Sequence, residues 1–163
     1  MTATSGETPK RPRLVVIALL LAAVVCSINV TVAAVAVPAI GTHFNAAQTA
    51  LNLVSLGTGL GLSMSVLYLG ALADRYGRKQ MLVVGVALTI VGSALSAVAP
   101  SIEALIAAQV FVGIAGGMAF PTTLSLISAL WSEGPRRTGV IALWSSFASM
   151  ASVLGAVLAG LAL

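Results

Sequence analysis

Long apolar runs and short polar segments alternate along the chain. The apolar runs cover about residues 14–37, 49–72, 81–99, 103–130 and 139–163. A helix needs about 20 apolar residues to cross the hydrocarbon core of a bilayer, and these runs have about that length or more. The pattern therefore predicts five transmembrane helices with short connections, which is the fold class of an all-α polytopic membrane protein.

The composition agrees with this fold class. Hydrophobic residues make up 59% of the chain and charged residues 7%, and the mean hydropathy is +1.09. Soluble domains carry about 25% charged residues. So few charges leave too little polar surface to keep the folded chain in water, and the soluble classes are excluded.

The polar segments contain signals for the ends of the helices. The segment before the first run, residues 1–13, is rich in Thr, Ser, Pro and basic residues, and we predict a disordered tail there. Asn45 followed by Gln48 resembles a capping box, so the second helix should begin at this point. Pro100 ends the third run, and Ser101 can cap the fourth helix with its hydroxyl.

The basic residues lie in three segments, which are the tail, the second–third connection and the fourth–fifth connection. The other two connections contain no Lys or Arg. Because Lys and Arg mark the cytoplasmic side of membrane proteins, we predict a multi-pass protein of the cell (inner or plasma) membrane with a cytoplasmic N-terminus. These residues are Lys10, Arg11, Arg13, Arg75, Arg78, Lys79, Arg136 and Arg137.

Other classes of protein find no support in the sequence. The basic residues occur in short groups and not along one face, so no nucleic acid is predicted as a partner. Cys26 and His43 are the only cysteine and histidine, so neither a disulfide nor a metal site is predicted. No nucleophile–base pair is recognisable, and we predict neither an enzyme nor a cofactor.

Small residues recur at helical spacing within the runs. Transmembrane helices pack through such residues, because lipid provides no hydrophobic drive for helix association. We therefore predict a compact helical bundle, with direct contact to a solute as the less favoured role of any single small residue. The stripes contain Gly57 and Gly61; Gly85, Thr89, Gly92 and Ser96; Gly113 and Gly117; and Ser145, Ser149, Ser152, Ala156 and Gly160.

Few polar side chains lie within the runs. Asn29 and Thr31 belong to the first run. Gln109 in the fourth run shares one helix face with Gly113, Gly116 and Phe120. The two amides need partners in an apolar medium, so they either hydrogen-bond between helices or line a cavity. No Asp, Glu, Lys or Arg lies deep in any run, and the chain thus offers no intramembrane carboxylate as a proton carrier.

The stretch 70–79 is the longest polar interruption between two apolar runs. It reads G-x-x-x-D-R-x-G-R-K, and it resembles the signature loop of the major facilitator superfamily in sequence, in position and in its cytoplasmic side. The resemblance covers the whole chain after the tail and implies the N-terminal five helices of a six-helix half bundle. We expect the chain to stop before the sixth helix and to lack the C-terminal half of the transporter.

A finer resemblance is to the fourteen-span drug/proton antiporter branch of that family. Residues 29–38 resemble the motif of its first helix, where Asn29 replaces the family's Asp. Residues 109–117 resemble the motif of its fourth helix, where Gln109 replaces Arg and Val112 replaces Gln.

The antiporter motif of the fifth helix resembles residues 155–160. Ala156 replaces the central Pro of this motif, and Ala159 replaces the first of its final two glycines. The acid and the base that the resemblance links to proton coupling are thus neutral amides here, which leaves proton antiport open. We expect cavity or coupling roles at Asn29, Thr31, Gln109, Gly113, Gly155 and Gly160.

The resemblance implies transport by alternating access, with the 70–79 loop as a conformational latch. Gly70 would let the second helix approach the other half, and Asp74 would accept hydrogen bonds from a helix N-terminus or pair with a cation. The basic residues would bind carboxylates or anionic headgroups, although fixing the topology is an equally good interpretation of Arg78 and Lys79. The residues of this latch are Gly70, Asp74, Arg75, Gly77, Arg78 and Lys79.

The expected function is that of a transmembrane transporter segment that exports a solute or drug. Its partners would be the lipid bilayer, a small-molecule solute, the C-terminal half of the transporter and, if it is coupled, protons. One alternative is a uniporter or importer of a small metabolite on the same fold, which the loss of the charged pair favours. Another is a truncated, non-transporting membrane protein, which the odd number of spans favours.

Overall fold

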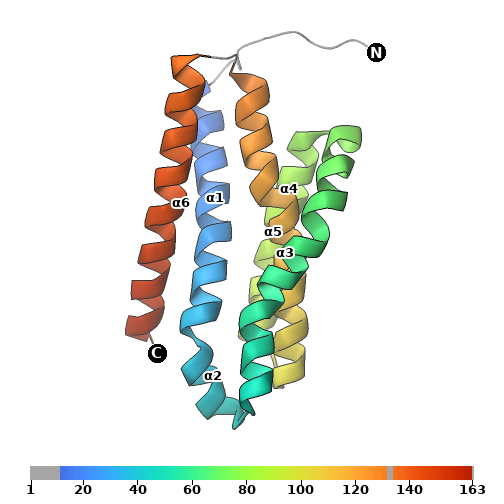
Figure 1. The fold of residues 1–163 in the computed structure, drawn as a ribbon, viewed down its shortest axis with the longest axis vertical. Coiled ribbons are helices and arrows are strands. Elements are labelled where there is room, and N and C mark those ends of the chain that lie inside the picture. The colour runs from blue at the N-terminus through green and yellow to red at the C-terminus, as the bar shows by residue number, and fades with distance from the viewer. Residues whose placement is uncertain (1–11, 132–133, 163) are drawn as a thin grey trace.

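The computed structural model describes residues 12–131 and 134–162. At positions 12, 67, 70, 71 and 74 it describes the backbone but not the surroundings of the residue. Most of the tail predicted to be disordered, residues 1–11, lies outside this part of the chain. The surroundings of the predicted latch residues Gly70 and Asp74 also lie outside it. The described secondary structure is helical throughout (Figure 1). The helices are α1 (Pro12–Val35), α2 (Val37–Phe44), α3 (Gln48–Tyr76), α4 (Arg78–Ala97), α5 (Ile102–Leu130) and α6 (Pro135–Ala162).

Five of these helices, all except α2, are long and apolar enough to cross a membrane. The predicted all-α polytopic membrane fold is therefore confirmed. Figure 1 shows the start of α1, the α3–α4 joint and the start of α6 at one end of the bundle. The basic residues described at these places consequently share that end, as the charge pattern predicts.

The first membrane helix continues beyond its predicted end near residue 37. The amide of Ala36 donates to Val32 O (2.9 Å), and the amide of Ile40 donates to Ala36 O (2.9 Å), so helical bonds bridge α1 and α2. Pro38 has no N–H to donate, and the axis can bend there. Part of the expected polar joint is thus a helical turn.

The capping box predicted at the start of the second membrane helix is wrong. Asn45 ends α2 in the left-handed region (φ 48°), a conformation that Asn tolerates better than most residues. Ala47 precedes α3 without a side-chain cap, and Gln48 donates to Asn52 Oδ1 instead (3.1 Å). The cap predicted at Ser101 is confirmed, because Ser101 Oγ accepts from the amide of Ala104 (3.3 Å).

The joint at residues 70–79 is almost entirely helical, in contrast to the polar loop expected from the sequence. Helix α3 runs to Tyr76 and α4 begins at Arg78, so Gly77 alone separates them. No proline interrupts α3 there, and a helix need not stop where the apolar run stops. Gly77 has a φ of 99°, which a glycine adopts without the strain that a Cβ would cause.

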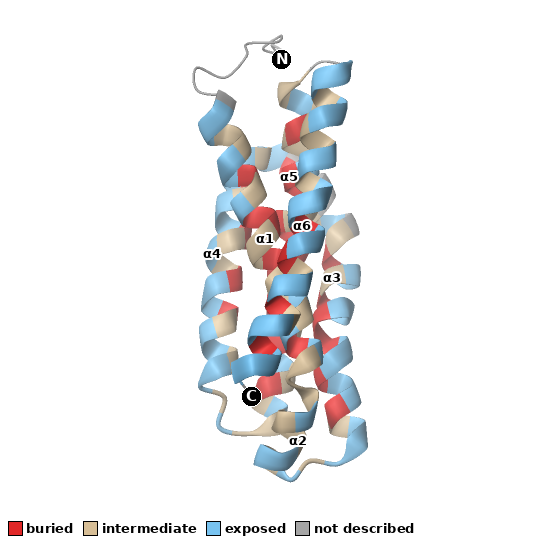
Figure 2. Cartoon of the chain, turned by 90° about the vertical axis from the view of Figure 1, so that its left-hand side faces the viewer, coloured by how far each residue is buried: buried red, intermediate tan, exposed pale blue. Residues whose placement is uncertain are grey.

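Helix α5 is the centre of the bundle. It packs most extensively against α3 and α4, whereas α1 packs mainly against α6 and secondarily against α5. In its membrane-crossing window 56% of the residues are buried, against 17–33% in the other four spans. Figure 2 shows the buried residues on the inner faces and exposed residues outside. The outer faces are themselves apolar, with Leu56, Leu60 and Leu158 at least half exposed, and therefore suit contact with lipid.

The backbones of α3 and α5 cross in direct contact. A Cβ on Gly61 would lie 2.1 Å from Val110 O, and a Cβ on Gly113 would lie 2.1 Å from Thr58 O. No larger residue fits at either position without moving a helix. The predicted role of these small residues in helix packing is thereby confirmed at this crossing.

Candidate functional site

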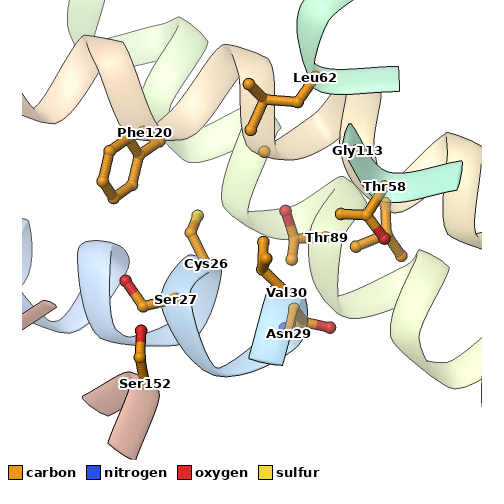
Figure 3. Close-up of a pocket in the computed structure, with 12 residues that line it drawn as sticks. Cys26, Ser27, Asn29, Val30, Thr58, Leu62, Thr89, Gly113, Phe120 and Ser152 are labelled. Carbon is orange, nitrogen blue, oxygen red and sulfur yellow. The ribbon is translucent and has the colours of Figure 1, made fainter. Parts of the chain in front are cut away.

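A cavity of about 250 Å³ lies between α1, α3, α4, α5 and α6 (Figure 3). Leu62 on α3, Thr89 on α4 and Gly116 on α5 all line it, and each lies near the middle of its helix by residue number. Ser152 of α6 lines it from the other side. The cavity is therefore near the middle of the spans, far from both ends of the bundle.

The wall of the cavity on α5 is open at Gly116. Gly113 and Gly116 both line the cavity, and a Cβ on Gly116 would meet no other atom within 4 Å. In Figure 3 the ring of Phe120 and the thiol of Cys26 both point into the space between α5 and α1. The sequence placed Gln109, Gly113, Gly116 and Phe120 on one face of a helix, and all of them except Gln109 line the cavity.

Asn29 lines the cavity and also links two helices. Its amide nitrogen donates to Val25 O (2.9 Å) within α1, and its Oδ1 accepts from Ser93 Oγ of α4 (2.6 Å). The two roles considered for the intramembrane amides are therefore combined at this position. The Ser93 hydroxyl also lies 2.8 Å from Thr89 O, so its proton has two acceptors within reach.

Gln109, unlike Asn29, does not line the cavity. Its Oε1 accepts from Thr58 Oγ1 (2.8 Å), the side chain is 9% exposed, and it is not among the residues that line the cavity. A Cβ on Gly57 would lie 3.2 Å from its Cβ. Gln109 thus connects α3 with α5 beside their glycine crossing.

The other expected coupling residues lie outside the cavity. Thr31 donates to Ser27 O within its own helix (3.1 Å). A Cβ on Gly155 would approach Ile28 of α1 at 3.4 Å, an ordinary packing distance, whereas Gly160 is exposed and lines a shallow groove beside Pro38. The fifth-helix motif of the sequence is therefore a packing surface for α1 at Gly155, and Gly160 is separate from it.

Three of the hydroxyl groups that line the cavity donate their protons within the protein. The Thr58 hydroxyl donates to Gln109, the Thr89 hydroxyl donates to Gly85 O (2.8 Å), and the Ser152 hydroxyl donates to Ala148 O (3.2 Å). None of the described residues that line the cavity is charged. The cavity is thus an apolar space with a few oxygen acceptors on its walls.

The residues of the expected latch are divided between two environments. The half-buried Arg78 donates from Nη1 to the carbonyl oxygen of Ser125 on α5 (3.0 Å). Arg75 and Lys79 are exposed, and the guanidinium of Arg75 lies 5.8 Å from the ring centre of Tyr76. The structure therefore connects Arg78 to α5 within this bundle and leaves Arg75 and Lys79 at the surface.

A second arginine binds the same end of α5. Arg137 Nη2 of α6 donates to Ser128 Oγ (3.2 Å). No pattern in the sequence indicated Ser125 or Ser128 as the partner of an arginine. A general signal exists, because the last carbonyls of a helix favour basic side chains, but it does not say which distant arginine supplies the charge.

An aromatic contact next to the cavity was also missed. The ring centres of Phe120 and Trp144 are 4.9 Å apart, and Trp144 Nε1 donates to Thr123 Oγ1 (2.9 Å). A tryptophan within a membrane span needs an acceptor for its N–H, and this need could have indicated that Trp144 bonds to a polar residue of another helix. Together these contacts fix the cavity-lining Phe120 against α6.

The described part of the chain contains no group of three or more His, Cys, Asp or Glu residues that could hold a metal ion. Hydroxyls, the Asn29 amide and the Cys26 thiol therefore provide the polar groups of this cavity. That set can bind an uncharged molecule by shape and by a small number of hydrogen bonds.

Known proteins resemble this chain over most of its length. The family model of the Major Facilitator Superfamily matches residues 19–163. The "Multidrug efflux pump LfrA" of Mycolicibacterium smegmatis is 36% identical over 160 residues, which are 98% of this chain and 32% of that protein. The "Methylenomycin A resistance protein" of Bacillus subtilis is 31% identical over 90% of this chain and 31% of its own length.

A third relative is the "Tetracenomycin C resistance and export protein" of Streptomyces glaucescens. It is 28% identical over 151 residues, which are 93% of this chain and 28% of that protein. The chain thus spans about a third of the length of the curated relatives that it matches.

Proposed function

This chain belongs to the Major Facilitator Superfamily, and we propose that it forms part of an exporter of small solutes or drugs in the cell membrane. The observation that carries the proposal is the cavity of about 250 Å³ near the middle of the five spans. Solute sites of secondary transporters lie near the bilayer midplane. The relatives named for drug efflux and resistance support export as the direction of transport.

The proposed mechanism is alternating access. A longer transporter that contains this segment would close against the face of the cavity that this chain leaves open, first from one side of the membrane and then from the other. The remaining part of the transporter, the bilayer and a small solute are the proposed partners. The grouping of basic side chains at one end of the bundle supports a cytoplasmic N-terminus.

The latch role of the α3–α4 joint is also a proposal. The bond from Arg78 to Ser125 O would hold the joint on α5, so that the exposed Arg75 and Lys79 are presented to carboxylates or lipid headgroups. A contact formed in only one state shifts the population by its differential energy, and about 1–3 kcal/mol is a typical coupling. Arg78→Gln should therefore change the ratio of inward-open to outward-open protein.

Arg75→Gln is a second test of the latch, because it removes one of the exposed charges that the joint would present. Spin-label distance measurements across the two sides of the complete transporter give the population ratio. If both variants retain the wild-type ratio, the joint only fixes topology.

Uncoupled transport of a solute is a second candidate function. Asn29 and Gln109 are neutral amides, and both have hydrogen-bond partners on other helices. Neither can release a proton at physiological pH, so these two positions cannot carry protons through the bundle. In proteoliposomes made with the complete transporter, transport that persists after the proton gradient is collapsed would favour this candidate.

The experiment on the export proposal fills the cavity from α5. Gly116→Leu starts a side chain at a position where a Cβ would meet no atom within 4 Å, and Gly59→Leu adds the same volume on the exposed face of α3. Cells that express the complete transporter with Gly116→Leu should accumulate a panel of neutral dyes to the same level as cells that do not express the transporter. Cells that express Gly59→Leu should accumulate as little dye as cells that express the wild type. Equal export by the two variants would contradict the proposal.

A further inference from the structure

The cavity provides no counter-charge for an ion. Its described lining consists of apolar side chains, glycines, hydroxyls, the Asn29 amide and the Cys26 thiol. A charge that leaves water for such a space loses its hydration and gains no ion pair. A neutral solute avoids that cost. The cavity therefore favours neutral over charged solutes, even when the two have the same shape.

The hydrogen-bonding groups on the walls lead to the same conclusion. The hydroxyl protons of Thr58, Thr89 and Ser152 are bonded within the protein, while their oxygen lone pairs remain as acceptors. A solute with one or two O–H or N–H groups can donate to them. A quaternary ammonium ion has no N–H to donate, so the hydroxyl oxygens attract it only weakly, through their dipoles.

The ring of Phe120 is the remaining attraction for a cation. It lines the cavity and at the same time packs against Trp144, with ring centres 4.9 Å apart. Contact with one aromatic face is weaker than the desolvation cost of the ion, whereas an aromatic solute gains from the same ring by stacking.

We infer that this cavity binds neutral, largely apolar or aromatic solutes and excludes permanent organic cations, and that Asn29 determines this selectivity. The inference rests on the proposed transport function and names its substrate class. Asn29 is the position where one atom decides the charge of the cavity, because Asp has the same shape. A carboxylate there would keep the Ser93 hydroxyl as a donor and would lose the bond to Val25 O.

A matched pair of probes tests the inference by binding alone. Benzoylcholine carries a trimethylammonium group, and 3,3-dimethylbutyl benzoate has the same shape with carbon in place of the charged nitrogen. The chain is placed in nanodiscs, and equilibrium dialysis measures each probe in excess of its uptake by protein-free nanodiscs. For the wild type we expect saturable binding of the ester and at least about tenfold weaker binding of benzoylcholine.

Substitutions at Asn29 and at a control position test whether Asn29 determines the difference in binding between the two probes. Asn29→Asp should tighten benzoylcholine binding by about tenfold and should not tighten binding of the ester. Asn52→Asp makes the same substitution at an exposed position of α3 outside the cavity and should change the binding of neither probe. If Asn29→Asp fails to fold, as judged by circular dichroism, Val30→Asp adds a carboxylate to the same lining without removing the Asn29–Ser93 bond.

Three results would overturn the inference. One is equal binding of both probes by the wild type. Another is an unchanged ratio of the two affinities with a carboxylate at position 29 or 30. The third is the absence of saturable ester binding, or ester binding that survives Gly116→Leu. Dye export by the complete transporter is measured separately, so the export proposal can fail or stand whichever result is obtained.

Discussion

Gly113 and Gly116 are three residues apart on α5, and they have opposite surroundings. A Cβ on Gly113 would lie 2.1 Å from the carbonyl oxygen of Thr58, whereas a Cβ on Gly116 would meet no atom within 4 Å. The first glycine permits two helices to touch, and the second leaves room for a solute. The residue type alone therefore does not define the role of a small residue in a membrane helix, which depends on the neighbouring helix.

The largest effect is expected on the closely packed side of α5. Gly113→Ala forces a methyl group into the backbone of α3, and overpacking of this kind costs about 3 kcal/mol. Reversible unfolding in mixed detergent micelles, followed by circular dichroism, measures that loss of stability. Gly59→Ala is the control, since Gly59 is exposed and has no neighbour within 4 Å, and its effect should stay within about 0.5 kcal/mol. Equal stabilities of the two variants would remove the distinction between the two sides.

A smaller effect is expected from the polar bond beside the glycine crossing. Thr58→Val removes the hydroxyl that donates to Gln109 Oε1 at 2.8 Å and leaves a buried acceptor without that donor. We expect a loss of about 1–2 kcal/mol in the free energy of unfolding. Thr31→Val is the matched control, because the Thr31 hydroxyl bonds only to its own helix. A control as destabilised as Thr58→Val would show that the bond between the helices has no special weight.

The smallest effect is expected on the open side of α5, where Trp144 holds Phe120. Trp144→Phe removes the N–H that donates to Thr123 Oγ1 at 2.9 Å but keeps an aromatic ring near Phe120. The expected loss is about 0.6 kcal/mol in the same unfolding measurement. Trp144→Ala also removes the ring and should cost more. If the two substitutions cost the same, the ring contact does not contribute to stability.

The sequence predicts the packed side of α5 better than its open side. Glycines four apart, such as Gly57 and Gly61 or Gly113 and Gly117, form a periodic pattern that indicates helix contact whatever the partner is. For the cavity, the sequence placed Gly113, Gly116 and Phe120 on one helix face, but whether that face borders a cavity depends on the positions of α1 and α6. For the same reason the sequence left two roles open for Asn29.

The ends of the helices show a similar division. The cap at Ser101 is a local interaction, and the sequence predicted it correctly. Asn45 was assigned to the wrong helix, because its side chain suits an N-cap and its backbone suits a left-handed C-terminal residue equally well. The bond from Arg78 to Ser125 O joins residues 47 positions apart, and no local pattern indicates it.

The single cysteine of the chain offers a direct test of whether the space beside Gly116 admits a solute. Cys26 lines the cavity opposite Phe120, so the rate at which N-ethylmaleimide, a small neutral reagent, alkylates it in folded protein reports access to that space. We expect measurable alkylation of the wild type, an unchanged rate in Gly59→Leu and a rate at least about tenfold lower in Gly116→Leu. Alkylation of Gly116→Leu at the wild-type rate would show that the space does not admit a solute.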